Sequence, residues 1–206
     1  MMQYFNCFTI LCMIWLTALN LFVNADNQIG TITKQPNTPI PVNINVPSGN
    51  CFEFLLYGFG VQIYQCVTNG SSTQWSLVGP DAYLINDIKS GKFTPQYEVA
   101  HHYYQKTPVN DGKITWQSII SEDTSLVITK LIAQSPSPDG SENIAWLKTQ
   151  TTSNQGKGAF ENITYVLRIN SKGGVAPPLA QCGTYQNGTL YSSNYTTEYW
   201  YFSKNC

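Results

Sequence analysis

The sequence predicts an all-β fold, a single-domain antiparallel sandwich or barrel stapled by disulfides. Short β-prone runs recur at a spacing of roughly 8–12 residues, separated by Gly, Pro and Asn turn-formers. No stretch of eleven or more residues beyond the N-terminal segment shows the 3.6-residue period of an amphipathic helix. Without alternating long helices, the parallel α/β architecture used by most nucleotide enzymes is excluded.

The N-terminal segment has the pattern of a signal peptide, and we assign residues 1–25 to it. Phe8–Val23 is an apolar run followed by Val23-Asn24-Ala25, which suits cleavage before Asp26. The alternative is an uncleaved anchor, but 16 residues span only about 24 Å as a helix, short of a ~30 Å hydrocarbon core. We therefore expect a secreted protein, extracellular or in a cell wall, with one domain over residues 26–206 and no membrane contact after cleavage.

Cysteines and glycosylation motifs agree with export. The mature chain keeps an even set of four cysteines, which in an oxidising compartment indicates two disulfides with three possible connectivities: Cys51, Cys66, Cys182 and Cys206. None of them has the spacing of a zinc site, so no metal is expected. Four Asn-X-Ser/Thr motifs predict N-glycosylation, at Asn69, Asn162, Asn187 and Asn194.

Strand-like patterns begin at Pro39–Val46, where every second residue is apolar. Cys51–Tyr57 and Val61–Cys66 then predict a hairpin around Gly58-Phe59-Gly60. Further strands are expected at Gln74–Val78, Ala82–Ile88, Phe93–Tyr104, Lys113–Ser121, Leu126–Gln134, Ile144–Thr151, Ala159–Asn170, Gly188–Ser192 and Tyr195–Phe202.

The net charge of the chain excludes one class of partner. The chain has 11 Lys and Arg against 12 Asp and Glu, for a net charge of −1, so a basic nucleic-acid binder is excluded. Ser, Thr, Asn and Gln carry most of the polarity. The expected surface is neutral and rich in hydroxyl and amide groups.

Several separate segments resemble one known family in order and spacing: Gly60–Cys66, Pro80–Leu84, Ile144–Leu147 and Ile163–Pro178. They resemble the uncharacterised secreted family called domain of unknown function 3455, over about Cys51 to Phe202. The chain departs from that family in having Ser171 and two extra cysteines. The resemblance implies that Cys66 and Cys182 are the shared pair, which leaves Cys51 for Cys206. The residues by themselves also allow Cys51–Cys66 with Cys182–Cys206. A weaker similarity, in secretion, size and composition only, is to the spherulins of stress-induced encystment.

Members of that family often carry the label malate dehydrogenase, which the residues here do not support. A dinucleotide site needs GxGxxG between a strand and a helix, so that the helix N-terminus holds the pyrophosphate. Gly58-Phe59-Gly60-Val61-Gln62-Ile63 lacks the third glycine and leads into a strand. No cofactor is therefore expected.

His101 is the candidate for acid–base chemistry, because it and His102 are the only histidines. On a strand the two neighbours point to opposite faces. His101 would act with a carboxylate such as Glu98 or Glu161; the alternative is a hydrogen-bonded structural histidine. No GxSxG, SxxK or HExxH motif is present. The sequence therefore favours a protein without a catalytic centre.

Ligand-binding candidates are Trp200, Tyr199 and Arg168. Trp200 and Tyr199 have opposite parity in an aromatic strand, so one face could fill the core while the other stacks on sugar rings; core packing explains the same pattern. Arg168 is the only basic residue between Phe160 and Asn170 and could bind a carboxylate or phosphate. Its alternatives are a solvent-facing edge position or an ion pair with Glu53, Glu161 or Glu198.

Three functional hypotheses follow from these features. The first is a secreted, N-glycosylated structural protein of an extracellular matrix or cell wall, active in stress response or encystment. The second is an extracellular module that binds polysaccharide or wall components through exposed Trp and Tyr. The third is a hydrolase centred on His101. Oligomeric state is not predicted.

Overall fold

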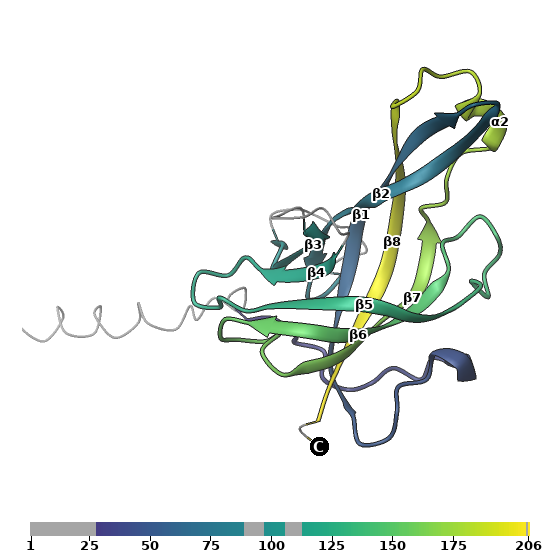
Figure 1. The fold of residues 1–206 in the computed structure, drawn as a ribbon. Coiled ribbons are helices and arrows are strands. Elements are labelled where there is room, and N and C mark those ends of the chain that lie inside the picture. Colours follow the sequence, from purple (N-terminus) through teal and green to yellow (C-terminus); the bar gives the residue numbers. More distant parts are fainter. Residues whose placement is uncertain (1–27, 89–96, 106–112, 205) are drawn as a thin grey trace, which may run out of the picture.

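A computed structural model describes residues 28–88, 97–105, 113–204 and 206, and these form a closed antiparallel β-barrel (Figure 1). Each strand pairs with the next along the chain, and the last pairs with the first. The strands are β1 (Cys51–Asn69), β2 (Ser72–Ile85), β3 (Ala100–Gln105), β4 (Lys113–Ser118), β5 (Leu126–Ser135), β6 (Trp146–Gln155), β7 (Ile163–Gly173) and β8 (Leu190–Ser203). The all-β, disulfide-linked prediction is confirmed, and of its two forms the barrel is the one observed.

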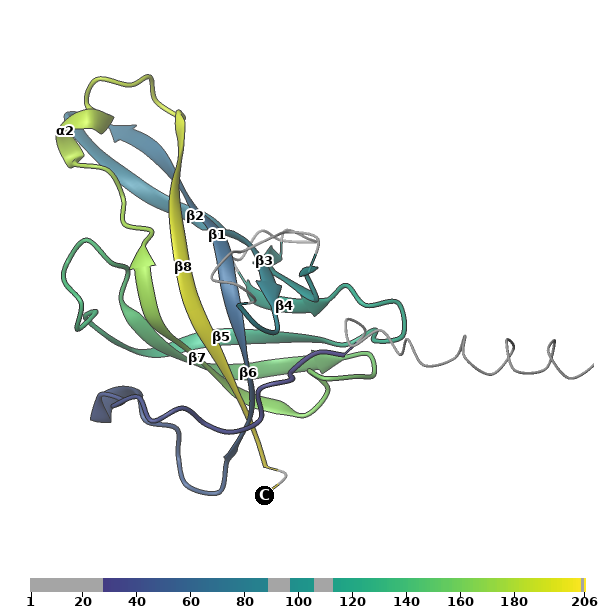
Figure 2. The ribbon, with the colours of Figure 1, turned by 180° about the vertical axis from the view of Figure 1, so that it is seen from behind.

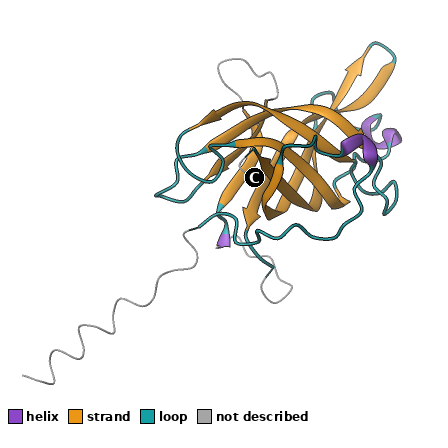
Figure 3. Ribbon diagram, turned by 90° about the horizontal axis from the view of Figure 1, so that it is seen from below, coloured by secondary structure: helices purple, strands orange, loops and turns teal. Residues whose placement is uncertain are grey.

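Helix is confined to short segments of the described chain (Figure 3). The 3-10 turn η2 (Val42–Ile44) and the helix α2 (Leu179–Cys182) each span less than two turns. No helix among the described residues is long and apolar enough to cross a membrane. The expected signal peptide, residues 1–25, and the expected mature start at Asp26 lie outside the described residues.

The hairpin predicted around Gly58-Phe59-Gly60 is wrong, because β1 runs unbroken through these residues. The two glycines allow close packing instead of a turn. A Cβ on Gly58 would overlap the Tyr199 ring, and one on Gly60 would overlap the Asp81 carbonyl oxygen. The chain reverses only at Gly70, whose φ of 61° is a left-handed turn conformation.

Strand β2 likewise joins two predicted strands, Gln74–Val78 and Ala82–Ile88. The expected turn at Gly79-Pro80-Asp81 is a bulge, since the register with β1 shifts between Ile63↔Gly79 and Tyr64↔Leu77. The strands predicted at Gly188–Ser192 and Tyr195–Phe202 are also one strand, β8. The first residues of the strand predicted at Phe93–Tyr104, 93–96, lie outside the described residues. Its second half corresponds to β3, Ala100–Gln105.

Residues 28–50, which we call the strap, cover one outer face of the barrel (Figures 1 and 2). The strand predicted at Pro39–Val46 is absent, and η2 takes part of its place. Pro39 and Pro41 have no N–H to donate to a strand ladder. The apolar residues of the strap pack instead on side chains of β1, β7 and β8: Ile32, Ile40, Ile44 and Val46 against Leu55, Leu167, Ile169, Trp200 and Phe202.

Strands β1, β2 and β8 continue beyond the rest of the barrel, and we call this extension the arm (Figure 1). Disulfide Cys66–Cys182 ties α2 to β1 in the arm. Disulfide Cys51–Cys206 joins the start of β1 to the C-terminus. One disulfide therefore lies near each end of β1.

Candidate functional site

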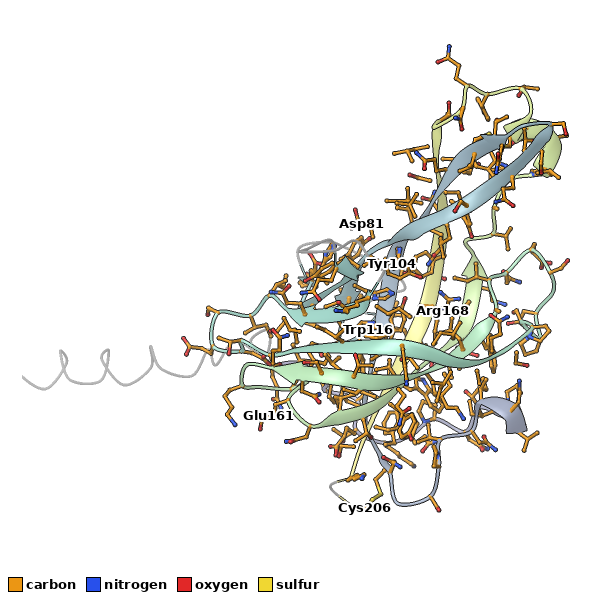
Figure 4. The ribbon with its side chains drawn as sticks, viewed as in Figure 1. Asp81, Tyr104, Trp116, Glu161, Arg168 and Cys206 are labelled. Atoms are coloured by element: carbon orange, nitrogen blue, oxygen red, sulfur yellow. A yellow bond between two sulfur atoms is a disulfide. The ribbon has the colours of Figure 1, made fainter. Side chains whose placement is uncertain are left out.

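The barrel interior changes from apolar to polar along its axis. Apolar and aromatic residues such as Phe54 and Leu56 of β1 fill one part of it. Further along β1, buried Gln62 lines a small cavity of about 30 Å³. The cavity is lined by Gln62, Pro80, His102, Tyr104, Ile114, Trp116, Leu147, Arg168 and Tyr199. Figure 4 shows Tyr104, Trp116 and Arg168 among these strands.

Three nitrogen donors at this cavity have no hydrogen-bond partner within the described residues. They are Nε of Arg168, Nε2 of Gln62 and Nε1 of Trp116, and each atom is buried. Within the described part of the chain, Arg168 donates through Nη2 to the Ala145 carbonyl oxygen at 3.0 Å. Buried donors without partners cost folding free energy, so the presence of three such donors in residues that line one cavity needs an explanation.

His102 stays neutral inside the barrel. Burial lowers its pKa to about 3; the hydrogen bond to Thr115 opposes this shift, and the charges of Arg168 and His101 add to it. Because the Thr115 carbonyl can only accept, Nδ1 of His102 carries the proton and donates across 2.9 Å. The ring stacks on Trp116 with centroids 4.5 Å apart.

Phenol groups next to this cavity also stay protonated. The Tyr195 and Tyr199 hydroxyls lie 2.9 Å apart. Burial raises the pKa of Tyr195 to about 12 and that of Tyr199 well above its usual value. Because His102 is neutral, Arg168 is the only cationic side chain among the described residues that line the cavity.

None of the ion pairs considered for Arg168 forms within the described part of the chain. Glu198 accepts hydrogen bonds from Trp200 Nε1 at 2.8 Å and Asn170 Nδ2 at 3.0 Å instead. Glu53 bonds Ser203. Glu161 pairs with Lys157 at 3.4 Å and lies far from Arg168 in Figure 4.

His101 lies on the opposite side of β3 from His102, at an outer pocket of about 500 Å³. Its Nδ1 lies 2.8 Å from Glu98 Oε1 and its Nε2 2.8 Å from Asp81 Oδ1. The structure therefore brings His101 to Glu98, as one alternative expected, and adds Asp81, which the sequence did not indicate. Glu161 is not part of this group.

This arrangement limits the chemistry of His101. Both ring nitrogens are occupied by carboxylate oxygens on opposite edges of the ring, so the two carboxylates do not converge on one ion. No group of three His, Cys, Asp or Glu suited to a metal occurs among the described residues. Neither nitrogen is free to take a proton from a nucleophile in this geometry.

The exposed stacking face expected at Trp200 and Tyr199 is absent. Both side chains are 0% exposed. Tyr199 points into the barrel, and Trp200 lies under the strap. Exposed aromatic residues occur on the arm instead, where Tyr185 and Tyr191 each lie 5.9 Å from the Trp75 ring. No periodicity distinguished those residues in the sequence.

A third hollow, the β6–β7 groove, lies on the outside of the barrel with a volume of about 710 Å³. Almost all of its side chains carry a hydroxyl or an amide. Its lining is Ser48, Asn50, Gln150, Thr151, Thr152, Ser153, Asn154, Ile163, Thr164, Tyr165 and Lys204. No sequence motif marked this groove, because its residues come from the strap, β6, β7 and the C-terminal segment.

The disulfides have the pairing that the family resemblance implied: Cys66 with Cys182 and Cys51 with Cys206. The alternative pairing of Cys51 with Cys66 is therefore wrong. All four asparagines of the glycosylation motifs are exposed: Asn69, Asn162, Asn187 and Asn194. Their exposure leaves each accessible to modification.

A family model described as Protein of unknown function (DUF3455) matches residues 47–203, which include all eight strands of the barrel. The chain belongs to the DUF3455 family. A search of curated proteins and a search of solved structures each found no match. A DUF3455 domain with two disulfides fits an extracellular structural protein.

Proposed function

We propose that this DUF3455 protein is a secreted, N-glycosylated component of an extracellular matrix or cell wall, and that it holds polysaccharide in the β6–β7 groove. A role in stress response or encystment is part of the proposal, supported by the similarity to spherulins in size and composition. The observation that carries the proposal is the chemistry of the groove.

Neutral polysaccharide suits the groove because sugar hydroxyls both donate and accept hydrogen bonds, as do its Ser, Thr, Asn and Gln side chains. Gln150 Nε2 donates to the Tyr165 hydroxyl across a long distance of 3.4 Å. Both groups therefore retain hydrogen-bonding capacity for a ligand. The Tyr165 ring offers an apolar face to sugar C–H groups.

The size and charge of the groove agree with this ligand. Its volume of about 710 Å³ falls within the range of small-ligand sites, about 300–1,000 Å³. Among the described residues that line the groove, Lys204 is the only charged one. The groove therefore selects for hydroxyl-rich rather than strongly charged ligands.

Retention on insoluble polysaccharide tests the proposal. Protein secreted by a eukaryotic host is sedimented with chitin, cellulose or β-glucan particles, and we expect retention on at least one of them. Tyr165→Ala should weaken retention about three- to tenfold through loss of ring contact. Tyr191→Ala, which removes an exposed tyrosine of the arm, is the matched control and should bind like the wild type.

Two results would contradict the groove proposal. The first is no retention on any of the three particles. The second is loss of retention in Tyr191→Ala with none in Tyr165→Ala, which would move the binding surface to the arm.

The His101 pocket is where the hydrolase hypothesis can be tested, because it places a histidine between two carboxylates. We expect His101→Ala and the wild type to show equal, background rates on p-nitrophenyl esters and glycosides, since both ring nitrogens are occupied. Lys130→Gln, on the exposed side of β5, serves as a control. A loss of about 100-fold or more in His101→Ala alone would establish the hydrolase instead.

A further inference from the structure

The unpaired donors inside the barrel are complementary to an anion. Arg168 Nε, Gln62 Nε2 and Trp116 Nε1 are nitrogen donors, and none has a partner within the described structure. Gln62 is 2% exposed and Trp116 1% exposed. A bound oxyanion would accept from donors that otherwise remain buried and unsatisfied.

The charges at the inner cavity favour an anionic ligand over a cationic or neutral one. The cavity lining contains no carboxylate, and Arg168 forms no ion pair within the described residues. The neighbouring His102 is neutral and the phenols of Tyr195 and Tyr199 are protonated. The positive charge of Arg168 is therefore uncompensated within the described part of the barrel.

The inner cavity is large enough for only a small part of a ligand. A volume of about 30 Å³ holds little more than a water molecule or a single head group. Tyr104 and Pro80 line both this cavity and the outer pocket of about 500 Å³, so the two spaces adjoin at these residues. The outer pocket also presents Ile63 and Val78, which suit a hydrocarbon or aromatic body.

We propose that the barrel binds a small organic acid, with the carboxylate at Arg168 and Gln62 and the apolar body extending past Tyr104 and Pro80 into the outer pocket. Arg168 supplies the charge, and Gln62 and Trp116 supply neutral donors. This site lies inside the barrel, apart from the β6–β7 groove, and it does not depend on polysaccharide binding.

Isothermal titration with simple probes tests this site. Sodium benzoate and sodium hexanoate are titrated into the folded, disulfide-bonded protein, and we expect saturable binding of at least one. Benzamide, a neutral analogue of benzoate, should bind at least tenfold more weakly. Sodium sulfate should bind more weakly than the carboxylates, because it lacks an apolar body.

Matched variants locate the site. Arg168→Gln should weaken carboxylate binding about 10- to 100-fold, as expected for loss of a charged hydrogen bond. Lys130→Gln removes one exposed positive charge from β5 and should leave binding unchanged. Should Arg168→Gln fail to fold, Gln62→Leu tests the same site, with an expected loss of about two- to tenfold.

Three results would overturn the proposal. They are no binding of either carboxylate at millimolar concentrations, equal binding of benzamide and benzoate, and unchanged binding in folded Arg168→Gln or Gln62→Leu protein. Sulfate that binds as tightly as the carboxylates would also overturn the assignment to an organic acid.

Discussion

Replacing Cys66 and Cys182 together by alanine is expected to lower the free energy of unfolding by about 3 to 4 kcal/mol. The disulfide closes a loop with a sequence separation of 116 residues and restricts the unfolded chain. Because Cys51–Cys206 encloses the same segment, the unfolded variant remains partly restricted, and the loss is smaller than for an isolated link. Urea unfolding followed by circular dichroism measures it.

Local opening provides an independent readout of the same change. The link holds α2 against the arm, so limited proteolysis of the variant should begin near Leu179–Cys182 before the barrel unfolds. The control is the Cys51→Ala/Cys206→Ala variant, which should leave cleavage at α2 unchanged. A change in stability below about 1 kcal/mol would contradict the entropic account of the Cys66 link.

Acidification from pH 6.5 toward pH 3 is expected to destabilise the barrel through His102. Its pKa is lowered from 6.5 in the unfolded chain to about 3 in the folded protein, so protons bind the unfolded state preferentially within this range. The contribution of His102 to stability is therefore fully present above pH 6.5 and declines as pH falls. By pH 4.5 the loss should reach about 3 kcal/mol.

A histidine variant separates this effect from other titrating groups. His102→Gln keeps a polar side chain without an imidazole, and its stability should change less between pH 6.5 and pH 4.5 than that of the wild type. The comparison is of urea unfolding midpoints across that range. Equal pH dependence in both proteins would show that His102 does not titrate on unfolding as proposed.

Where a strand formed, alternation placed its side chains correctly, although the alternating residues Pro39–Val46 form no strand. It placed His101 and His102 on opposite faces of one strand, and the structure has them outside and inside the barrel. It also separated Tyr199 from Trp200. Both results follow from the two-residue period of a strand, which is a local property of the chain.

Glycine and proline, which are typical of turns, predicted the local structure less reliably. Gly58, Gly60 and Pro80 were expected in turns, yet they lie inside β1 and β2. Glycine permits both a turn and the close approach of a neighbouring side chain, and which of these occurs depends on the facing residue. For Gly58 that residue is Tyr199, which is more than a hundred positions away in the chain.

The amino-acid sequence by itself determined the strand content, the alternation of inner and outer faces and the neutral polar surface, because these depend on residue type and local spacing. Only the tertiary structure decided that Trp200 is covered by the strap and that Asp81 joins Glu98 at His101. It also decided that Gln62, Trp116 and Arg168 line one cavity, each with a buried nitrogen that has no partner among the described residues. Those relations depend on barrel closure, which brings distant strands together at positions that no local pattern encodes.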